Sequence, residues 1–351
     1  MQRRSFAVSA ALVAATFASA AQAQSLTALY DAARAYDELG LEPSIKHAPF
    51  PYQSEALAAW AERRSRGVVV LPTGAGKTYV ATLAIAARQR STLVVVPTLD
   101  LMNQWYDVLK SAFPGTVGLV GGGYHDVQRL TVTTYDSAHL HMDRLGNRFG
   151  LVIFDECHHL PSPSYATAAK MCLAPFRLGL TATPERSDGM PILHWFDDRI
   201  AAELRLWDAI DQQYLAPFLY FGIHDGIDLT DIPWRRGRGY ETEALTNRYT
   251  SSDAWARLVV RQVDEHVDVT SMRCLGFCVS VEHAAFMARH FSHHGIPAVA
   301  ISGESPRDDR ARALRDLAAG EVKVVFSVDL FNEGVDLPNV DTVLMLRPTE
   351  S

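Results

Sequence analysis

Short, continuous apolar runs recur along this chain, and helical patterns separate them. The first series consists of VVVLP (68–72), TLVVVP (92–97), LTVTTY (130–135), LVIFDE (151–156) and FRLGLTAT (176–183). A strand that is apolar at every position is buried on both faces, as in a parallel sheet covered by helices. These runs therefore predict an α/β unit built around a parallel sheet.

A second series of apolar runs follows in the last third of the chain. It consists of CLGFCVS (274–280), AVAIS (298–302), KVVFSVDLF (323–331) and TVLMLR (342–347), with helical patterns over 281–293 and 306–319. We therefore predict two α/β units, over residues 25–200 and 201–351. The stretch 186–270 is less regular and contains several prolines. We expect it to connect the units and lead into the second sheet.

Composition excludes several classes of protein. The chain has 351 residues, 48% of them hydrophobic, which is enough for two domains with cores. A formal net charge of -7 argues against a protein that coats nucleic acid by bulk positive charge, although a local basic groove stays open. The cluster Arg235, Arg236 and Arg238 fits either phosphate contacts or a solvated loop. The four cysteines are too scattered for a disulfide framework, so we predict buried, reduced thiols.

A glycine-rich string, LPTGAGKT at 71–78, follows a predicted strand and precedes a helical pattern, which predicts a phosphate-binding loop. Its glycines let the backbone approach an anion. Lys77 would meet the β- and γ-phosphates of ATP, and the Thr78 hydroxyl would ligate Mg²⁺. Leu71 stands where the strict pattern has glycine, and the alternative is a chance glycine turn before Lys-Thr. The predicted ATP-binding residues of the loop are Thr73, Gly74, Ala75, Gly76, Lys77 and Thr78.

Two adjacent carboxylates, Asp155 and Glu156, stand at the carboxyl end of a predicted buried strand. Open α/β sheets bind ligands at that edge. We expect Asp155 to join Thr78 as a Mg²⁺ ligand and Glu156 to act as the base that orients or deprotonates the attacking water. His158 would couple this site to the neighbouring domain. A zinc pair with His159 is the alternative, but adjacent residues do not easily face one metal ion.

The order of these motifs resembles that of superfamily 2 helicases of the DExH type, close to the XPB-type and type III restriction subunit families of DNA-dependent ATPases. The resemblance covers roughly residues 50–350. It implies two RecA-like domains with parallel sheets covered by helices, the second incomplete at its C-terminus. It also implies a hydrolase that uses ATP and Mg²⁺, with Lys77, Asp155 and Glu156 as catalytic residues.

Two further motifs would contact the nucleotide in this family. PYQSEAL at 51–57 supplies Tyr52 and Gln53 for the pair that reads adenine, with Phe50 where the family usually has arginine. NEGVDLPNVD, near the end of the chain, would place Gly334 and Asp336 against nucleotide and nucleic acid.

Other motifs imply nucleic-acid contacts and coupling. VVPTLDLMNQW and TTYDS resemble two nucleic-acid motifs, and the matching candidates are Pro97, Thr98, Thr133 and Thr134. LTATPER resembles the motif that links hydrolysis to domain movement, through Thr181 and Thr183. Hydroxyls and amides directed at phosphates bind a nucleic acid through its backbone without reading sequence. Tryptophans either stack bases or pack in cores; the candidates are Trp105, Trp207 and Trp255.

The partner is expected to be DNA, and an RNA helicase or a non-catalytic binding module are the alternatives. The family's sixth motif, which supplies an arginine for the transferred phosphoryl group, is expected just beyond Pro348, and the sequence stops at Ser351. We therefore expect slow ATP hydrolysis unless a partner or a further segment supplies that arginine.

The first 24 residues point in another direction. They have a basic start with Arg3 and Arg4, an Ala-rich apolar stretch and a small-x-small ending at residues 21–23, as in a signal peptide. ATP is scarce outside the cytoplasm, so the ATP site favours a cytoplasmic protein and conflicts with this leader. Two alternatives stay open: an exported protein of unrelated function, and a misplaced start codon. No later stretch has the roughly 20 apolar residues of a membrane-spanning helix, and none is expected.

Overall fold

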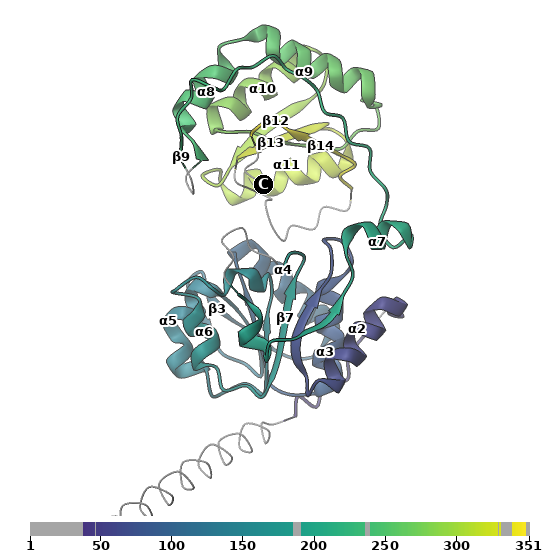
Figure 1. The fold of residues 1–351 in the computed structure, drawn as a ribbon, viewed down its shortest axis with the longest axis vertical. Coiled ribbons are helices and arrows are strands. Elements are labelled where there is room, and N and C mark those ends of the chain that lie inside the picture. Colours follow the sequence, from purple (N-terminus) through teal and green to yellow (C-terminus); the bar gives the residue numbers. More distant parts are fainter. Residues whose placement is uncertain are drawn as a thin grey trace, which may run out of the picture. The chain divides into compact units, whose positions relative to one another are not determined.

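The computed structural model describes residues 38–45, 47–184, 191–235, 239–328, 330 and 339–348. It divides the chain into two compact units, Met1–Pro217 and Phe218–Ser351, and each unit has its own sheet (Figure 1). The first unit therefore extends past residue 200, where the sequence suggested a boundary. The leader-like residues 1–24 lie outside the described residues.

The first sheet has eight strands in the order β4-β3-β5-β2-β6-β7-β1-β8. Its neighbours are parallel except for the antiparallel pair β3 and β4. The strands are β1 (Arg66–Val70), β2 (Thr92–Val96), β3 (Val117–Gly121), β4 (Tyr124–Asp126), β5 (Leu130–Thr134), β6 (Leu151–Phe154), β7 (Phe176–Thr181) and β8 (Ile200–Glu203). All five predicted runs form strands here, which confirms the α/β prediction for this unit.

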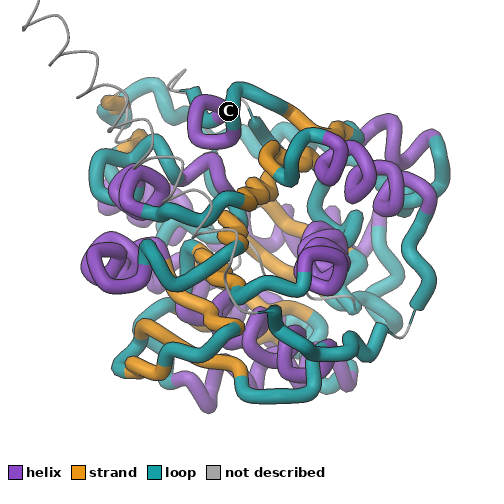
Figure 2. The backbone as a smooth tube through the Cα atoms, turned by 90° about the horizontal axis from the view of Figure 1, so that it is seen from below, coloured by secondary structure: helices purple, strands orange, loops and turns teal. Residues whose placement is uncertain are grey.

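Helices cover both faces of this sheet, as the ribbon and the backbone tube show (Figures 1 and 2). The helices are α2 (Pro51–Glu62), α3 (Lys77–Arg88), α4 (Leu99–Ala112), α5 (Tyr135–Leu145), α6 (Ala166–Met171) and α7 (Leu206–Asp211), with 3-10 turns η1 (Cys157–His159) and η2 (Leu193–Phe196). Neighbouring strand residues enter separate cores: Val69 and Ile153 pack with α2, α3 and α4, while Val68 and Phe154 pack with α5 and α6. Burying each such side chain contributes about 1.5–3 kcal/mol, so packing on both faces holds the strand ends in place.

The second unit has a four-stranded parallel sheet in the order β12-β13-β11-β14. Its strands are β11 (Cys274–Phe277), β12 (Ala298–Ser302), β13 (Val324–Val328) and β14 (Thr342–Met345), and its helices are α8 (Thr242–Thr250), α9 (Asp253–His266), α10 (Val281–His293) and α11 (Arg307–Ala319). A short antiparallel pair, β9 (Trp234–Arg235) and β10 (Gly239–Tyr240), precedes them. Two sheets of mainly parallel strands, covered by helices, confirm the predicted α/β fold class.

The middle of the chain is more regular than its sequence indicated. Residues 186–270 were expected to connect the units and lead into the second sheet, and α8 and α9, which precede that sheet in the second unit, lie within them. In α9 the residues Trp255, Ala256, Val260 and Val263 are buried, which is the spacing of one helical face. Prolines before residue 240 obscured this pattern.

Burial settles two alternatives that the sequence left open. Trp105 and Trp255 are buried in cores, whereas Trp207 is 65% exposed. All four cysteines are buried and unpaired, which confirms the prediction of reduced thiols. Among the described residues, no helix combines the length and the apolar character needed to cross a bilayer.

Candidate active site

The phosphate loop joins β1 to α3. α3 begins at Lys77, and Gly76 precedes it as the N-cap residue with a left-handed φ of +77°. Gly74 has a φ of +85°, which glycine adopts without the strain that a Cβ would cause. Thr73 and Gly74 are exposed, so the loop is open to a ligand. The first turn of a helix has N–H groups without intrahelical partners, and these favour a phosphate here.

Two side chains of α2 hold this loop through the Ala75 carbonyl oxygen. The Tyr52 hydroxyl donates to it at 2.8 Å, and the Gln53 amide N–H donates to it at 3.1 Å. The Gln53 amide oxygen accepts from the Phe50 N–H at 3.0 Å. Gln53 is therefore buried and tied to the loop, and its contact with an adenine base stays a prediction.

Gly76→Ala should weaken nucleotide binding more than it weakens the fold. A left-handed alanine costs about 1–2 kcal/mol, and a Cβ at position 76 would also lie 2.6 Å from Gln53 Nε2. Because Gln53 is anchored at both ends, the clash would displace the loop. The measurement is affinity for a fluorescent ATP analogue beside urea unfolding.

Gly40→Ala is the matched control, since Gly40 has a φ of +60° and a Cβ there would meet nothing within 4 Å. It should lose stability by strain alone and bind nucleotide normally. Equal nucleotide affinity in the two variants would show that the contact between Gly76 and Gln53 does not shape the loop.

The acidic strand end lies opposite the loop lysine. Lys77 Nζ is 3.4 Å from Glu156 Oε1, and the two side chains are only 10% and 11% exposed. Glu156 has a left-handed φ of +46°. Such a backbone is strained for a residue other than glycine and persists only where surrounding contacts hold it. Here it turns the chain sharply from β6 into η1.

Asp155 is held at both carboxylate oxygens. Oδ2 accepts from the Trp105 indole N–H at 2.7 Å, and Oδ1 accepts from the Glu156 N–H at 3.0 Å. Burial, followed by the neighbouring Glu156 carboxylate, raises the pKa of Asp155 to about 6. The Trp105 hydrogen bond and the Lys77 charge oppose that rise.

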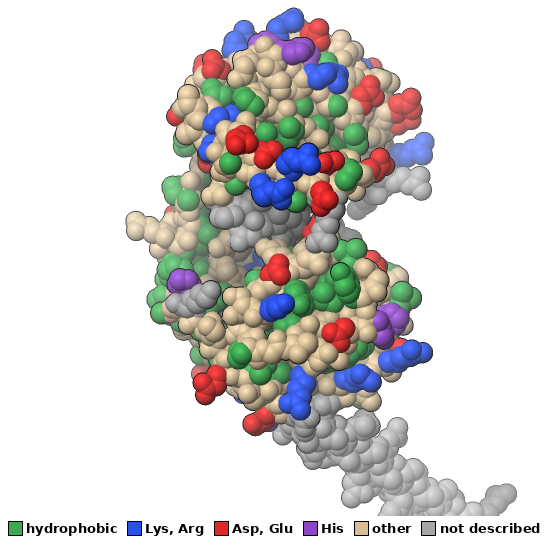
Figure 3. All heavy atoms as spheres, turned by 180° about the vertical axis from the view of Figure 1, so that it is seen from behind, with side chains coloured by type: hydrophobic (Ala, Val, Ile, Leu, Met, Phe, Trp, Pro, Cys, Tyr) green, Lys and Arg blue, Asp and Glu red, His purple; other side chains and the backbone are tan. Residues whose placement is uncertain are grey.

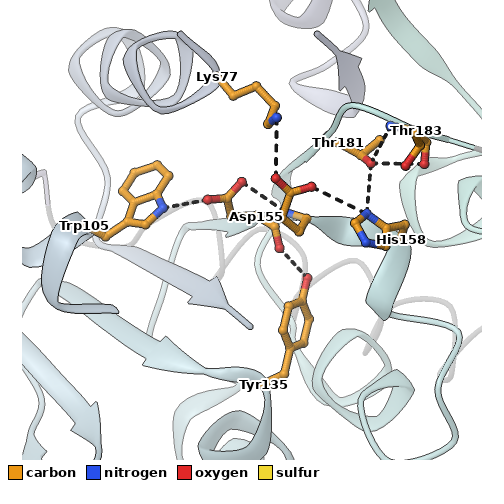
Figure 4. A network of polar contacts seen from close by, with 8 residues as sticks. Lys77, Trp105, Tyr135, Asp155, His158, Thr181 and Thr183 are labelled. Atoms are coloured by element: carbon orange, nitrogen blue, oxygen red, sulfur yellow. Dashed lines mark hydrogen bonds and ion pairs between the residues drawn. The ribbon is translucent and has the colours of Figure 1, made fainter. Parts of the chain in front are cut away.

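His158 connects this strand end to β7 (Figure 4). Its Nδ1 lies 3.5 Å from Glu156 Oε2 and 3.1 Å from Thr181 Oγ1. Thr181 Oγ1 also accepts from the Thr183 N–H at 3.1 Å. The structure thus brings together Lys77, Glu156, His158 and the two threonines, as a coupling role requires. That role itself stays a prediction.

The residues present fit a magnesium ion better than zinc. Lys77 pairs with Glu156, so two carboxylates face one lysine and one negative charge remains for another cation. Magnesium prefers oxygen ligands and binds through one or two carboxylates plus substrate phosphates. Asp155 and the Thr78 hydroxyl offer such oxygens. In the described part of the chain, no three His, Cys, Asp or Glu side chains cluster as a metal site.

A second set of predicted residues lies where helices start at the carboxyl edge of the same sheet. Thr98 accepts from the Leu101 N–H at 3.2 Å and caps α4, while Thr134 accepts from the Ser137 N–H at 3.2 Å and caps α5. Thr98 is exposed and Pro97 half-buried. Thr133 is fully buried and donates its hydroxyl to the Val120 carbonyl oxygen. The nucleic-acid roles stay predictions, and that of Thr133 would require its hydroxyl to leave this bond.

Sequence reasoning missed a glycine turn at this edge. Gly121, Gly122 and Gly123 have φ values of +138°, +59° and +90° between β3 and β4. A Cβ on Gly121 would lie 2.9 Å from Ser137 Oγ, and one on Gly122 would lie 3.0 Å from Leu99. The turn therefore lies against the starts of α4 and α5. Three consecutive glycines after the apolar run at 117–120 were the available signal.

A pocket beside the phosphate loop was also missed. It has a volume of about 600 Å³ and is lined by residues 210, 211 and 213–217, at the end of α7 and directly after it. Tyr214 packs against the Tyr52 ring at 4.5 Å between centroids, and Tyr52 stacks on Phe50 at 5.8 Å. Leu215 lies beside Gly74, where a Cβ on the glycine would be 3.5 Å from its side chain. This segment lies more than 130 residues from the loop in sequence, so no local motif indicated it.

Some predicted residues lie outside the described residues. These are Gly334 and Asp336 of the fifth motif, and Arg236 and Arg238 of the basic cluster. On the face drawn in Figure 3, Lys and Arg side chains are interspersed with Asp and Glu instead of gathering in one basic field. This mixture agrees with the net charge of -7.

Comparison with known proteins gives two family matches. Residues 46–186 match the family described as the res subunit of type III restriction enzymes, and residues 259–351 match the helicase conserved C-terminal domain. The first match contains the phosphate loop and the acidic strand end. The second match lies within the second unit.

Full-length relatives point the same way. The DNA 3'-5' translocase XPB2 of Sulfurisphaera tokodaii is 30% identical over an alignment that covers 87% of this chain and 78% of that protein. The DNA 3'-5' helicase XPB of Kineococcus radiotolerans is 28% identical and covers 84% of this chain and 53% of its own length. The chain thus spans most of the first relative and about half of the second.

Solved structures share the fold. The helicase domain of Pyrococcus furiosus Hef aligns with a TM-score of 0.51 at 16% identity, over 86% of this chain and 90% of that one. The ATP-dependent Type ISP restriction-modification enzyme LlaBIII, solved with DNA, aligns with a TM-score of 0.62 at 15% identity, over 87% of this chain and 26% of that one. At these identities the likeness concerns the fold alone.

Proposed function

This chain belongs to the superfamily 2 helicases, in the XPB-like group of ATP-dependent DNA helicases and translocases, and we propose that it hydrolyses ATP at the phosphate loop of its first unit. The observation that carries the proposal is the contiguous set of contacts from Lys77 through Glu156 and His158 to Thr181. These contacts join the phosphate loop to the end of β7, the next strand after Asp155 and Glu156 in the sequence. A carboxylate placed beside the phosphate-binding lysine suits a general base for the attacking water.

In the proposed reaction, the loop amides and Lys77 bind the phosphates of ATP, and Lys77 exchanges its Glu156 partner for phosphate oxygens. Glu156 then has an oxygen available for the attacking water and orients it or takes its proton. Thr78 and Asp155 would hold the Mg²⁺ ion, which supplies charge stabilisation for the phosphoryl group when bound. The aromatic rings of Phe50, Tyr52 and Tyr214 lie beside the loop and offer a surface for the base.

DNA would bind at the edge formed by the starts of α4 and α5 and by the turn at Gly121–Gly123. Helix N-termini and glycine amides attract phosphate without reading bases. Binding of this kind is independent of sequence and weakens steeply with salt. Movement along the strand would follow from the link between Glu156 and the Thr181–Thr183 segment.

The test is ATP hydrolysis by the purified full chain with and without duplex DNA. We expect duplexes of unrelated sequence to raise the rate equally, and added salt to remove the effect. Stimulation by duplex RNA but not by DNA would favour the RNA helicase alternative, because A-form and B-form helices present different backbones. Nucleotide binding with no turnover would favour a binding module.

A further inference from the structure

Trp105 is buried in the first unit and contacts the candidate metal ligand directly. Only 1% of the residue is exposed. Its indole N–H donates to Asp155 Oδ2 at 2.7 Å (Figure 4), across 50 positions of sequence. A 2.7 Å bond from N–H to a carboxylate is short and charge-assisted. From the sequence, Trp105 was a candidate for base stacking or core packing and had no expected role at the nucleotide.

The bond determines how the Asp155 carboxylate is oriented. Oδ1 takes the Glu156 N–H and Oδ2 takes the Trp105 indole N–H. A carboxylate has about four lone-pair positions, so two donors fix its plane and leave the others for a cation. Tyr135 fixes the same residue from the backbone, since its hydroxyl donates to the Asp155 carbonyl oxygen at 2.9 Å.

Trp105 is itself held in place by α4. The neighbouring α4 residues Leu101, Met102 and Leu109 pack in the same core as Trp105, and Thr98 caps the helix. The indole therefore cannot follow a rotating carboxylate, and the carboxylate is constrained to match the indole. Such outer contacts orient metal ligands and change metal affinity when they are removed.

We propose that Trp105 is a positioning residue for the metal site, and that its indole N–H holds the Asp155 carboxylate in the orientation that binds Mg²⁺ with ATP. The inference rests on the proposed function. It assigns to α4 a part in the nucleotide site besides its place at the proposed DNA edge.

Two substitutions separate the indole N–H from the bulk of the ring. Trp105→Phe keeps an aromatic ring and removes the donor. Trp105→His removes the benzene ring but keeps a ring N–H, since imidazole Nε2 is the same number of bonds from Cβ as indole Nε1. If Trp105 served packing alone, the smaller His would be the more damaging change.

Trp60→Phe is the matched control. Trp60 is also 1% exposed, belongs to the same core, and donates its indole N–H to the Arg177 carbonyl oxygen at 2.9 Å. It has no contact with Asp155 among the described bonds. The variant therefore loses an equivalent buried hydrogen bond at a distance from the metal ligand.

The experiment titrates Mn²⁺ by electron paramagnetic resonance in the presence of a non-hydrolysable ATP analogue, and follows thermal unfolding in parallel. Trp105→Phe should weaken Mn²⁺ affinity about 10- to 100-fold, the usual cost of losing an outer contact. Trp105→His should keep more of the affinity than Trp105→Phe while melting lower, and Trp60→Phe should keep all of it.

Unchanged Mn²⁺ affinity in Trp105→Phe would overturn the inference. So would a weaker affinity in Trp105→His than in Trp105→Phe, or the same loss in Trp60→Phe. If the unsubstituted chain held no Mn²⁺ with the nucleotide, the proposed function would fail first, and the inference with it.

Discussion

Glu156→Gln should lower the rate of ATP hydrolysis about 100- to 10,000-fold, the range for loss of a general base, while the nucleotide stays bound. The amide has the shape of the acid but cannot take a proton from water. Lys77, which lies 3.4 Å from Glu156, can use phosphate oxygens instead, so binding should survive. Phosphate release in steady state and the affinity for a fluorescent ATP analogue are the two measurements.

Glu38→Gln is a suitable control for this substitution. Glu38 also forms an ion pair, with Arg90 at 3.1 Å, but it is 74% exposed and lies away from the phosphate loop. Its rate should equal that of the unsubstituted chain. If Glu156→Gln kept more than about a tenth of the rate, the assignment of the base would be wrong.

Lys77→Ala should remove nucleotide binding as well as turnover. We expect the rate to fall about 100- to 1000-fold, as when one preorganised donor to a developing anion is lost. The substitution also leaves Glu156 at 11% exposure without its lysine partner, so the melting temperature should fall too. Calorimetric titration with a non-hydrolysable ATP analogue measures the binding, and a melting curve shows that the chain is folded.

Lys110→Ala is the control for the loss of a lysine. Its Nζ lies over the Tyr106 ring at 5.3 Å on α4 and contacts no residue of the phosphate loop in the described contacts. Normal ATP affinity in Lys77→Ala would contradict the assignment of the phosphate loop. Together, Glu156→Gln and Lys77→Ala separate turnover from binding.

The residues of the chemical site that lie close together in sequence were predictable. Each is carried by a strand followed by a turn: the loop after β1 gives Lys77 and Thr78, and the end of β6 gives Asp155 and Glu156. Parallel strands bring their carboxyl ends to one edge. Their contact across the sheet therefore follows from topology, and the 3.4 Å ion pair bears out their proximity.

Other contacts between distant segments were not predictable. Trp105 was open to stacking or packing, and no pattern indicated that its N–H would meet Asp155. Tyr214, after α7, packs on Tyr52, which holds the phosphate loop, and α9 was hidden in a stretch that contains prolines. Local sequence patterns do not predict such partners, because the partners depend on the register of strands and the rotation of helices in the packed unit.

The amino-acid sequence therefore sufficed to predict the fold class and to name the candidate reactive groups, because apolar runs specify burial and short motifs specify which groups stand at a strand end. Which side chains hold those groups was settled by packing in three dimensions. The carboxylate of Asp155 is oriented by the indole of Trp105, 50 residues away. The carbonyl of Ala75 in the phosphate loop is held by Gln53, 22 residues before it. These pairs exist because helices α2 and α4 bury their apolar faces on the same sheet.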